Sequence, residues 1–443
     1  VTLTVTDDDS ATIQAAGDTN VVEANSGQAA LPSGLLFSGN VDRFGNDDVS
    51  VDFGFSGTAE DAGSGAGSND YDVVTVSPLT FTSDGQSLPT QIQINGDTTL
   101  EHDETVTIDY SNINIAGVSV ATLGYNITFV NASTTYTIQN DDVAVFNILD
   151  VAATEGNSGT QDVMFTVESD SAVQVPGSFT VRTATQDGPV AGTAATSAGA
   201  SIGDGDYVAD SAMDITGWDG ATGAIGTDTV TVNGDTIVER NEILQVLFDV
   251  AGSVLDGYDT QLLPDGITNV LTFGGPGDLT INNNDSASIA VVSTDHSEPE
   301  GNAGTSVTAV AVQLSAQVQT YGGALTIRGT NENTPGGSSR TASFVGETPA
   351  FTGDSDYVRI QTADAAALIS LDESAAAASN FNNTINGDLV VETDESFFVE
   401  FTEDDLLGYG PGGSGSITFG ASFTEVIIEN DDSATISITT VAS

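Results

Sequence analysis

Apolar and polar residues alternate along most of this chain in short runs, and glycine or clusters of aspartate and asparagine separate the runs. Stretches such as VVTVSPLTF (73–81), TVTIDY (105–110) and VMFTVES (163–169) illustrate the pattern. Alternation of this kind, rich in Val, Ile, Thr and aromatic residues, is typical of β-strands with one buried face. No stretch has a sustained helical period, and the alanine-rich segment Asp372–Phe381 is the best candidate for one short helical turn. The pattern predicts an all-β protein built from sandwiches.

One phrase, in which a strand ends in acids or amides and the next strand begins, occurs four times. The copies are TVTDDDSATI (4–13), TIQNDDVAVF (137–146), TINNNDSASI (280–289) and IIENDDSATI (427–436). They recur about every 130 to 150 residues, whereas an immunoglobulin-like sandwich needs only about 100. Each repeat therefore has room for long loops. The repeats predict the last strand of a preceding domain at 1–9, three domains at 10–142, 143–285 and 286–432, and the first strand of a following domain at 433–443.

An acidic phrase with nearly constant spacing lies inside each repeat. Its copies are INGDTTLEHDE (94–104), VNGDTIVERNE (232–242) and INGDLVVETDE (385–395). Two shorter phrases precede it in the same order: a Glu-Gly/Ala-Asn turn that starts at Glu23, Glu155 or Glu300, and an Asp-Tyr pair that starts at Asp70, Asp206 or Asp356. Two carboxylates about 5 Å apart repel by roughly 3 kcal/mol at an effective dielectric constant near 20. Repeated acidic groups of this kind indicate bound cations.

Composition narrows the classes of partner. The chain of 443 residues carries 64 acidic residues against 6 basic ones, for a formal net charge of -58. Phosphate binding needs clustered cations, so this charge excludes nucleic acid and an anionic membrane surface as partners. No run approaches the roughly 18 apolar residues that would span a bilayer, so we expect no membrane insertion in this segment. Hydrophobic residues make up 39% of the chain and it has no cysteine, which indicates a folded, acidic protein without disulfides or thiolate sites.

The order of the phrases resembles the Calx-β domain, a calcium-binding sandwich module of sodium–calcium exchangers, of an integrin β chain and of many large extracellular bacterial proteins. The matching phrases are the Glu-Gly-Asn turn, the Asp-Tyr pair, PLTFTSDG (78–85), the Asp-x-x-x-Glu-x-x-Glu loop and the terminal Asp pair. The resemblance covers essentially the whole chain, three times over. It implies three tandem immunoglobulin-like β-sandwiches in an elongated array. In calcium-binding members of the family, these acids meet at one end of the sandwich and share several Ca²⁺ ions.

Carried over residue by residue, the resemblance implies one set of ligands in each repeat. The first set is Glu23, Asp70, Asp97, Glu101, Glu104, Asp141 and Asp142. The second set is Glu155, Asp206, Asp235, Glu239, Glu242, Asn284 and Asp285. The third set is Glu300, Asp356, Asp388, Glu392, Glu395, Asp431 and Asp432. Because Asn284 is an amide where the first repeat has Asp141, we expect the second site to hold fewer ions or to hold them more weakly.

The chemistry of the acids favours calcium, and each phrase also has a plainer interpretation. Ca²⁺ takes six to eight oxygen ligands in flexible geometry, Mg²⁺ keeps its waters, and a set without cysteine disfavours zinc. The plainer interpretation is structural. Asn-Gly is a common hairpin turn, Asp pairs often end strands, and the tyrosine of Asp-Tyr is expected to pack at the sandwich edge. We expect His102 in a solvated loop, and Trp218 fits either a core position or an aromatic platform.

The sequence does not favour an enzyme. His102 and His296 are the two histidines of the chain, and no Gly-x-Ser-x-Gly, Walker or dinucleotide-binding phrase occurs. Carboxylate pairs suited to glycoside hydrolysis are abundant, but they fall in the repeated clusters, whereas an active site is expected once.

We therefore expect a calcium-binding structural or adhesive segment of a long extracellular or cell-surface protein, such as a stalk, layer or filament. Its partners would be neighbouring repeats or subunits of the same protein, and also glycans or surface proteins. The alternative is a calcium-dependent glycan- or protein-binding module, while an intracellular calcium sensor fits poorly. Val143 follows Asp142 without a Gly/Ser/Pro linker, so a cation at the junction would fix the angle between domains.

Overall fold

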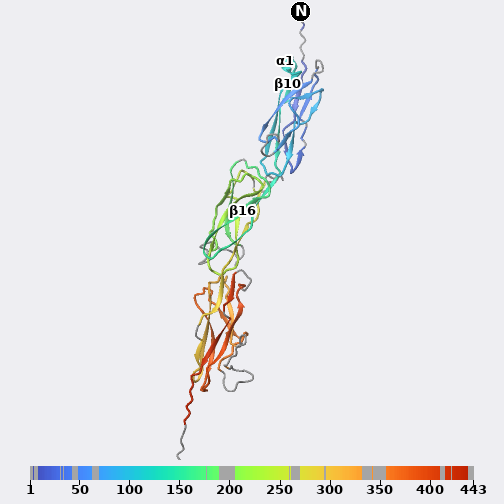
Figure 1. The fold of residues 1–443 in the computed structure, drawn as a ribbon. Helices are drawn as coiled ribbons and strands as arrows, with labels where there is room; N and C mark the ends of the chain where they lie inside the picture. The colour runs from blue at the N-terminus through green and yellow to red at the C-terminus, as the bar shows by residue number, and fades with distance from the viewer. Residues whose placement is uncertain are drawn as a thin grey trace, which may run out of the picture.

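Three β-sandwiches follow one another in an elongated array in this computed structural model, from the blue N-terminal sandwich to the red C-terminal one (Figure 1). The fold is all-β with immunoglobulin-like sandwiches, as the sequence pattern predicted. The structure describes residues 3, 8–29, 31–32, 34–41, 48–61, 69–175, 177–188, 205–258, 260, 270–293, 296–331, 342, 356–409, 415–420 and 422–437.

The first sandwich pairs a sheet of order β12-β1-β4-β8 with a sheet of order β2-β13-β10-β5-β7, in which β11 also pairs β10. A small third sheet, β3-β9-β6, completes it. Its elements are β1 (Ala11–Ala15), β2 (Thr19–Val22), β3 (Gly27–Ala29), β4 (Leu35–Ser38), β5 (Val49–Gly57), β6 (Tyr71–Val73), β7 (Leu79–Phe81), β8 (Ser87–Leu88), β9 (Ile92–Gly96), β10 (Glu104–Ile115), β11 (Val118–Ser119), α1 (Val120–Leu123), β12 (Ile127–Asn131) and β13 (Ser133–Gln139).

The second sandwich has the sheets β19-β16-β14-β22 and β15-β23-β20-β17-β18, with β21 paired to β17. Its strands are β14 (Val143–Ile148), β15 (Val151–Thr154), β16 (Gly159–Ser169), β17 (Phe179–Asp187), β18 (Met213–Thr216), β19 (Gly223–Gly234), β20 (Glu242–Phe248), β21 (Val254–Leu255), β22 (Val270–Phe273) and β23 (Gly277–Asn282).

The third sandwich has the sheets β29-β26-β24-β31 and β25-β32-β30-β27-β28. Its elements are β24 (Ser286–Val291), β25 (Ser297–Pro299), β26 (Gly304–Leu314), β27 (Thr326–Thr330), η3 (Ala365–Ala367), β28 (Leu368–Ser370), β29 (Ser379–Gly387), β30 (Glu395–Asp405), β31 (Ser416–Phe419) and β32 (Phe423–Glu429).

The same pairing scheme repeats in each sandwich. The chain enters through a strand that pairs in parallel with the penultimate strand, as β1 does with β12, and then crosses to the other sheet. There the second strand pairs in parallel with the last strand, as β2 does with β13. Alternating apolar residues of both sheets face inward and form a separate hydrophobic core in each sandwich.

Trp218 belongs to the core of the second sandwich. Its ring packs edge-on against Phe146 and Phe179, with ring centroids 5.3 Å away in both cases. Its indole N–H donates to the carbonyl of Ala221. The core interpretation is therefore correct, and Trp218 offers no aromatic platform to a ligand.

Two expectations about secondary structure were wrong. Asp372–Phe381 forms no helical turn, because the Asp372 carboxylate accepts the N–H groups of Ser374 and Ala377 and Ala375 adopts a positive φ. Its last residues instead begin β29. The run 73–81 is not one strand, since β6 ends at Val73 and β7 begins at Leu79, directly after Pro78, which has no N–H to donate to a ladder.

Helices of the described part of the chain are short, and none has the length and apolar character needed to cross a membrane.

Candidate metal sites at the sandwich ends

Parallel pairing brings the first and last acidic phrases of each repeat together. Because β2 and β13 run in parallel with Val22 opposite Gln139, both strands end at the same edge of the sheet. Glu23 follows Val22 directly, and the Asn-Asp-Asp phrase follows Gln139. The second and third sandwiches repeat this arrangement with Thr154 opposite Asn282 and Pro299 opposite Glu429.

The Asn-Gly-Asp phrase joins the same edge through an antiparallel pair. Gly27, which ends the Glu-Ala-Asn turn, lies opposite Gly96 of the acidic loop. A Cβ added to Gly96 would lie 2.0 Å from the carbonyl oxygen of Ala24, so only glycine permits this approach. The phrase is therefore the end of a strand pressed against the turn and not a hairpin turn of its own.

The Asp-Tyr pair completes the group. Tyr71 lies opposite Ile94, and Tyr207 and Tyr357 pair in the same way with Val232 and Ile385. These tyrosines are buried, and each preceding aspartate is buried at the acidic end. All four predicted phrases thus converge on one end of each sandwich.

A hydrogen-bonded asparagine organises each site, and sequence reasoning missed its role. The Asn140 amide donates to the carbonyl of Thr99, while its oxygen accepts the N–H of Asp142. Asn283 and Asn430 make the equivalent bonds in the other sandwiches. The signal was present, because an asparagine opens each of the three complete junction phrases.

A second asparagine holds the last junction acid. Asn25 donates a 2.5 Å hydrogen bond to Asp142, as Asn157 does to Asp285 and Asn302 does to Asp432. This residue is the asparagine of the Glu-Gly/Ala-Asn turn, so the turn and the junction are joined directly. The recurrence of the turn is thereby explained by its contact with the junction.

Among the residues that the structure describes, carboxylate oxygens approach one another closely in four groups of three. Within each group one oxygen per residue lies within 4.8 Å of the others. Two groups combine the turn glutamate with junction or loop acids, and two combine the Asp-Tyr aspartate with the two glutamates of the acidic loop. The groups are Glu23/Asp97/Asp142, Glu300/Asp431/Asp432, Asp206/Glu239/Glu242 and Asp356/Glu392/Glu395.

The predicted ligands differ in exposure. The buried ones are Glu23, Asp70, Glu101, Glu104, Asp142, Glu155, Asp206, Glu239, Glu242, Asp285, Glu300 and Asp356. The half-buried or exposed ones are Asp97, Asp141, Asp235, Asn284, Asp388, Glu392, Glu395, Asp431 and Asp432. Asp97, Asp235 and Asp388 accept the N–H two residues further on, which fixes the turn of each acidic loop.

Burial and mutual repulsion raise the pKa values of the turn glutamates far above their ordinary 4.5. Desolvation, followed by the charges of Glu101 and Asp97, raises the pKa of Glu23 to about 9. Desolvation and the charges of Asp235 and Asp285 raise the pKa of Glu155 to about 8. In the third sandwich the pKa of Glu300 rises to about 7 for the same reasons. These carboxyls hold protons near neutral pH unless a cation replaces them.

The glutamates of the acidic loop also have raised pKa values. Desolvation is the largest cause that raises the pKa of Glu239 to about 10, and the charges of Asp206 and Glu242 add to it. Desolvation also raises the pKa of Glu104 to about 7 and of Glu395 to about 8, each helped by a hydrogen bond to the aspartate of the Asp-Tyr pair. Acids of one group also raise the pKa values of glutamates in the other group, so the two groups of a sandwich interact electrostatically.

The sites contain buried oxygens that a cation would satisfy. One oxygen each of Glu239, Glu300 and Asp432 is buried and accepts no hydrogen bond. The ion pairs Arg182–Asp214 and Arg328–Asp404 lie outside the clusters. An unsatisfied buried carboxylate oxygen is costly, so the donor set fits a hard cation that takes oxygen ligands.

The second sandwich differs from the other two at its junction phrase, where its sequence also differs. Asn284 takes the position of Asp141, since its side-chain oxygen accepts the N–H of Gly156 as Asp141 accepts that of Ala24. The amide also donates to Asn157. Around its junction the second sandwich therefore has one carboxylate fewer than the others, and the triad described there is Asp206/Glu239/Glu242.

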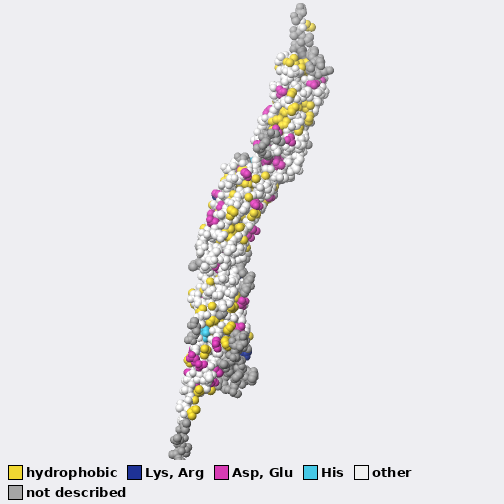
Figure 2. Space-filling view, viewed as in Figure 1, with side chains coloured by type: hydrophobic (Ala, Val, Ile, Leu, Met, Phe, Trp, Pro, Cys, Tyr) yellow, Lys and Arg dark blue, Asp and Glu magenta, His cyan; other side chains and the backbone are white. Residues whose placement is uncertain are grey.

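The acidic end of each of the first two sandwiches lies in the joint to the next one. Figure 2 shows acidic side chains gathered where the first sandwich meets the second and near the C-terminal end of the third. Gln174 donates to Glu104 across the first joint. His102 is half-buried and its ring stacks on Tyr258 at a centroid distance of 4.3 Å. The expectation of a solvated His102 was therefore wrong, because the neighbouring sandwich covers it.

Comparisons with known proteins give structural likeness only. No family model matches the chain, and no curated protein matches its sequence. The solved calcium binding domain CBD12 of CALX1.1 is 14% identical with a TM-score of 0.22, over 64% of this chain and 99% of that chain. CBD12 from CALX1.2 is 13% identical with a TM-score of 0.23, over the same shares. An I-band fragment of titin is 7% identical with a TM-score of 0.27, over 93% and 97%. At these identities and scores the likeness says nothing about ligands.

Proposed function

We propose that the acidic end of each sandwich binds Ca²⁺ and that the bound ions stiffen the joints of a structural segment. The observation that carries the proposal is the triad Asp206, Glu239 and Glu242, whose oxygens lie within 4.8 Å of one another although all three residues are buried. Each pair of charges at that separation repels by about 3 kcal/mol at an effective dielectric constant near 20. A structure that buries such a group needs either protons or a cation.

The kind of cation follows from the donor atoms. They are carboxylate oxygens with nearby amide and backbone oxygens, and the chain has no cysteine. Ca²⁺ accepts six to eight such oxygens in flexible geometry, whereas Mg²⁺ demands an octahedron and keeps its waters. When bound, the ion supplies positive charge in place of the protons that these carboxyl groups otherwise take up.

The proposed ligands are those predicted from the sequence, arranged as two adjoining groups. The turn glutamate and the junction acids form one group, and the Asp-Tyr aspartate with the two loop glutamates forms the other. The first sandwich would use Glu23, Asp97 and Asp142 in the former group, and the third would use both groups fully. Asn284 makes the second sandwich the weakest of the three.

The position of the sites supports a structural role. Residues that would hold the ion also touch the next sandwich, so binding and joint geometry share the same side chains. Calcium sites of extracellular modules are filled only at about 0.1 to 1 mM. A segment stiffened in this way therefore suits an extracellular or cell-surface stalk, layer or filament, whose partners are neighbouring repeats or subunits.

Heating scans test the proposal. A ligand that binds only the native state stabilises it by mass action, so the unfolding midpoint should be higher by several degrees in excess Ca²⁺ than in EDTA. Mg²⁺ at the same concentration should raise it less. Glu239→Gln should reduce the calcium effect, whereas Glu425→Gln, the same change on an exposed residue of β32, should not. Equal midpoints in EDTA and Ca²⁺ would contradict the proposal.

A further inference from the structure

The acidic loop of the first sandwich places one apolar residue in the core of the second. This residue, Leu100, forms a parallel bridge with Val173. Its N–H donates to the carbonyl of Ala172 at 2.9 Å, and its carbonyl accepts the N–H of Gln174 at 2.8 Å. Leu100 is 0% exposed and belongs to the hydrophobic core of the second sandwich, not of its own. It acts as a plug that completes the neighbouring core.

The second joint repeats this construction. Val238, at the same place in the acidic phrase, bridges Val318 of the third sandwich. Its N–H donates to the carbonyl of Gln317, and its carbonyl accepts the N–H of Gln319. It is also 0% exposed and lies in the core of the third sandwich. Two joints with different side chains therefore use the same register.

Val173 and Tyr258 form the socket that receives Leu100 in the second sandwich. The Tyr258 hydroxyl donates to the carbonyl of Leu100 at 3.2 Å. The N–H of Val173 donates to the carbonyl of Gly220 at 2.8 Å, and Gly220 lies two residues beyond Trp218. Leu100 and Trp218 belong to the same hydrophobic core. Packing at Leu100 therefore bears directly on the surroundings of the single tryptophan of the chain.

The plug and the proposed calcium ligands belong to one short loop. Leu100 directly precedes Glu101, whose side chain is buried. Glu104 of the same loop accepts a hydrogen bond of 3.1 Å from Gln174 across the joint. The second joint has the same order of residues at 238–242. An ion that fixes Glu101 consequently fixes the backbone that carries the plug.

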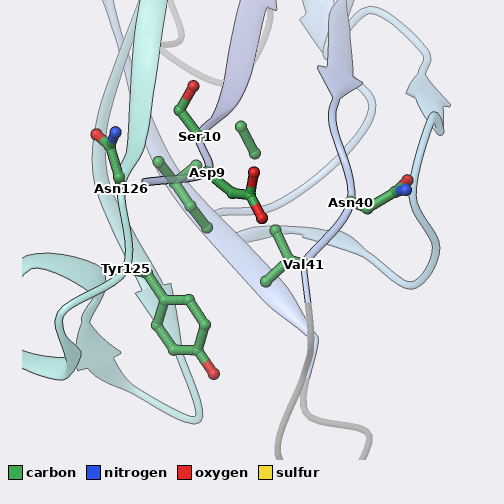
Figure 3. A pocket seen from close by; sticks show the side chains of 8 residues that line it. Asp9, Ser10, Asn40, Val41, Tyr125 and Asn126 are labelled. Atoms are coloured by element: carbon green, nitrogen blue, oxygen red, sulfur yellow. The ribbon is translucent and has the colours of Figure 1, made fainter. Parts of the chain in front are cut away.

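The first sandwich has a similar socket at the end where the chain enters it. Figure 3 shows Val41 and Tyr125 on opposite sides of a hollow of about 280 Å³. Tyr125 follows Gly124, whose φ of 82° is close to the values of the glycines before Tyr258 and Tyr409. We expect the preceding domain predicted at 1–9 to insert its own plug there. The construction would then continue toward the N-terminus.

We infer that calcium bound by one sandwich stabilises the next sandwich along the chain, because the loop that carries the ligands also holds the plug in its socket. The coupling has a direction, since the loop of the first sandwich completes the second core and the loop of the second completes the third. The role of the ion in this coupling rests on the proposed function, whereas the completion of each core rests on packing alone.

Trp218 makes the stability of the second sandwich measurable in the full chain, because it packs against Phe146 and Phe179 in that core. Urea unfolding is followed by its fluorescence in Ca²⁺ and in EDTA. Glu101→Gln alters a proposed ligand of the first sandwich, so we expect it to lower the Trp218 midpoint in Ca²⁺ and to leave it nearly unchanged in EDTA. Asp109→Asn, an exposed position on β10 of the same sandwich, is the control and should change neither midpoint.

Leu100→Ala should break the coupling. Loss of a buried leucine leaves a cavity, so the Trp218 midpoint should fall on the order of 1 M urea in both solutions. In that background Glu101→Gln should have no further effect. Leu100→Val should keep the coupling, because Val238 fills the equivalent place in the second joint. Leu123→Ala is the control, since this exposed leucine lies in α1 at the other end of the first sandwich (Figure 1).

The outcomes separate the coupling from calcium binding itself. A lower Trp218 midpoint in Glu101→Gln, seen in Ca²⁺ and abolished by Leu100→Ala, supports the coupling. Calcium that raises the midpoint equally in the native chain and in Glu101→Gln would overturn the coupling and leave the proposed binding intact. An effect of Glu101→Gln that persists in Leu100→Ala would overturn the role of the plug. Calcium that raises no midpoint in any variant would overturn the proposed function and the coupling together.

Discussion

The Tyr321 hydroxyl of the third sandwich donates a 2.6 Å hydrogen bond to the Glu242 carboxylate of the second. Glu242 is at the same time a member of the buried triad with Asp206 and Glu239. One carboxylate thus belongs both to a candidate calcium site and to the joint between two sandwiches. Beside it, the Arg240 guanidinium lies 5.3 Å from the Tyr321 ring centroid and donates to the carbonyl of Leu407. Charge at the site and angle at the joint are therefore physically connected.

Removing the Tyr321 hydroxyl should loosen this joint. A hydrogen bond to a charged group contributes about 1.5 to 3 kcal/mol, so Tyr321→Phe should broaden the range of angles between the second and third sandwiches. Small-angle scattering of the calcium-loaded chain measures this range. Tyr110→Phe is a matched control, because the hydroxyl of Tyr110 donates to Gln91 inside the first sandwich. Equal scattering of both variants and the native chain would contradict the role of Tyr321.

Restoring an acid at the second junction should strengthen its site. Asn284→Asp supplies the carboxylate that Asp141 provides in the first sandwich, and we expect calcium affinity there to rise on the order of tenfold, or about 1.4 kcal/mol. In the first sandwich, Asp142→Asn at the next junction position should weaken the site. Calcium titration calorimetry follows both. An unchanged titration of Asn284→Asp would show that this position does not face the ion.

The chelated protein should lose stability as pH rises. Burial raises the pKa of Glu239 to about 10 and of Glu155 to about 8, from an ordinary 4.5. The folded state then holds protons that the unfolded chain has released, so stability is fully present below about pH 4.5 and is lost as pH rises toward about 10. Urea midpoints in chelator at about pH 6 and about pH 9 measure the loss.

Two controls sharpen the pH experiment. Glu239→Gln should flatten part of the slope, whereas Glu425→Gln should leave it unchanged because that side chain is exposed on β32. Saturating Ca²⁺ should also remove the slope, since calcium replaces the protons. A chelated protein whose stability rises across this window would mean that the carboxyls are not protonated in the fold.

Much of the fold was predictable because its signals are local. The alternation of Thr105–Tyr110 and Val163–Ser169 gave strands in β10 and β16, and the junction phrases indicated where the chain passes from one sandwich to the next. The convergence of the acidic phrases at one end of each sandwich was implied by the family resemblance and not by their order or spacing alone.

What the sequence could not provide depends on contacts between distant segments. His102 reads as a loop residue because its partner Tyr258 lies in another sandwich. Leu100 reads as an apolar residue of an acidic loop, although it completes a neighbouring core. The failure at Asp372–Phe381 has a local cause, since alanine favours helix but the Asp372 carboxylate captures the backbone N–H groups first.

Chelation should loosen the joints before any sandwich unfolds. Without a cation, the acidic end of each of the first two sandwiches leaves buried, clustered carboxyl groups in the joint to the next sandwich, while the hydrophobic core of each sandwich keeps its own strand residues. We expect small-angle scattering of a rod-like particle in Ca²⁺ and a wider distribution of shapes in EDTA, with circular dichroism unchanged. Scattering that stays the same after verified calcium removal would restrict the ions to stabilising loops and would favour a binding module over a stalk.

The central claim is that the clustered carboxylates hold calcium, and counting the bound metal tests it most directly. The full chain is dialysed against buffered Ca²⁺ with excess Mg²⁺, and the calcium retained per chain is measured by atomic emission. We predict several ions per chain, fewer in Glu239→Gln, and an unchanged number in Glu425→Gln. Retention of no calcium above the dialysis buffer, or the same number in Glu239→Gln as in the native chain, would contradict the account.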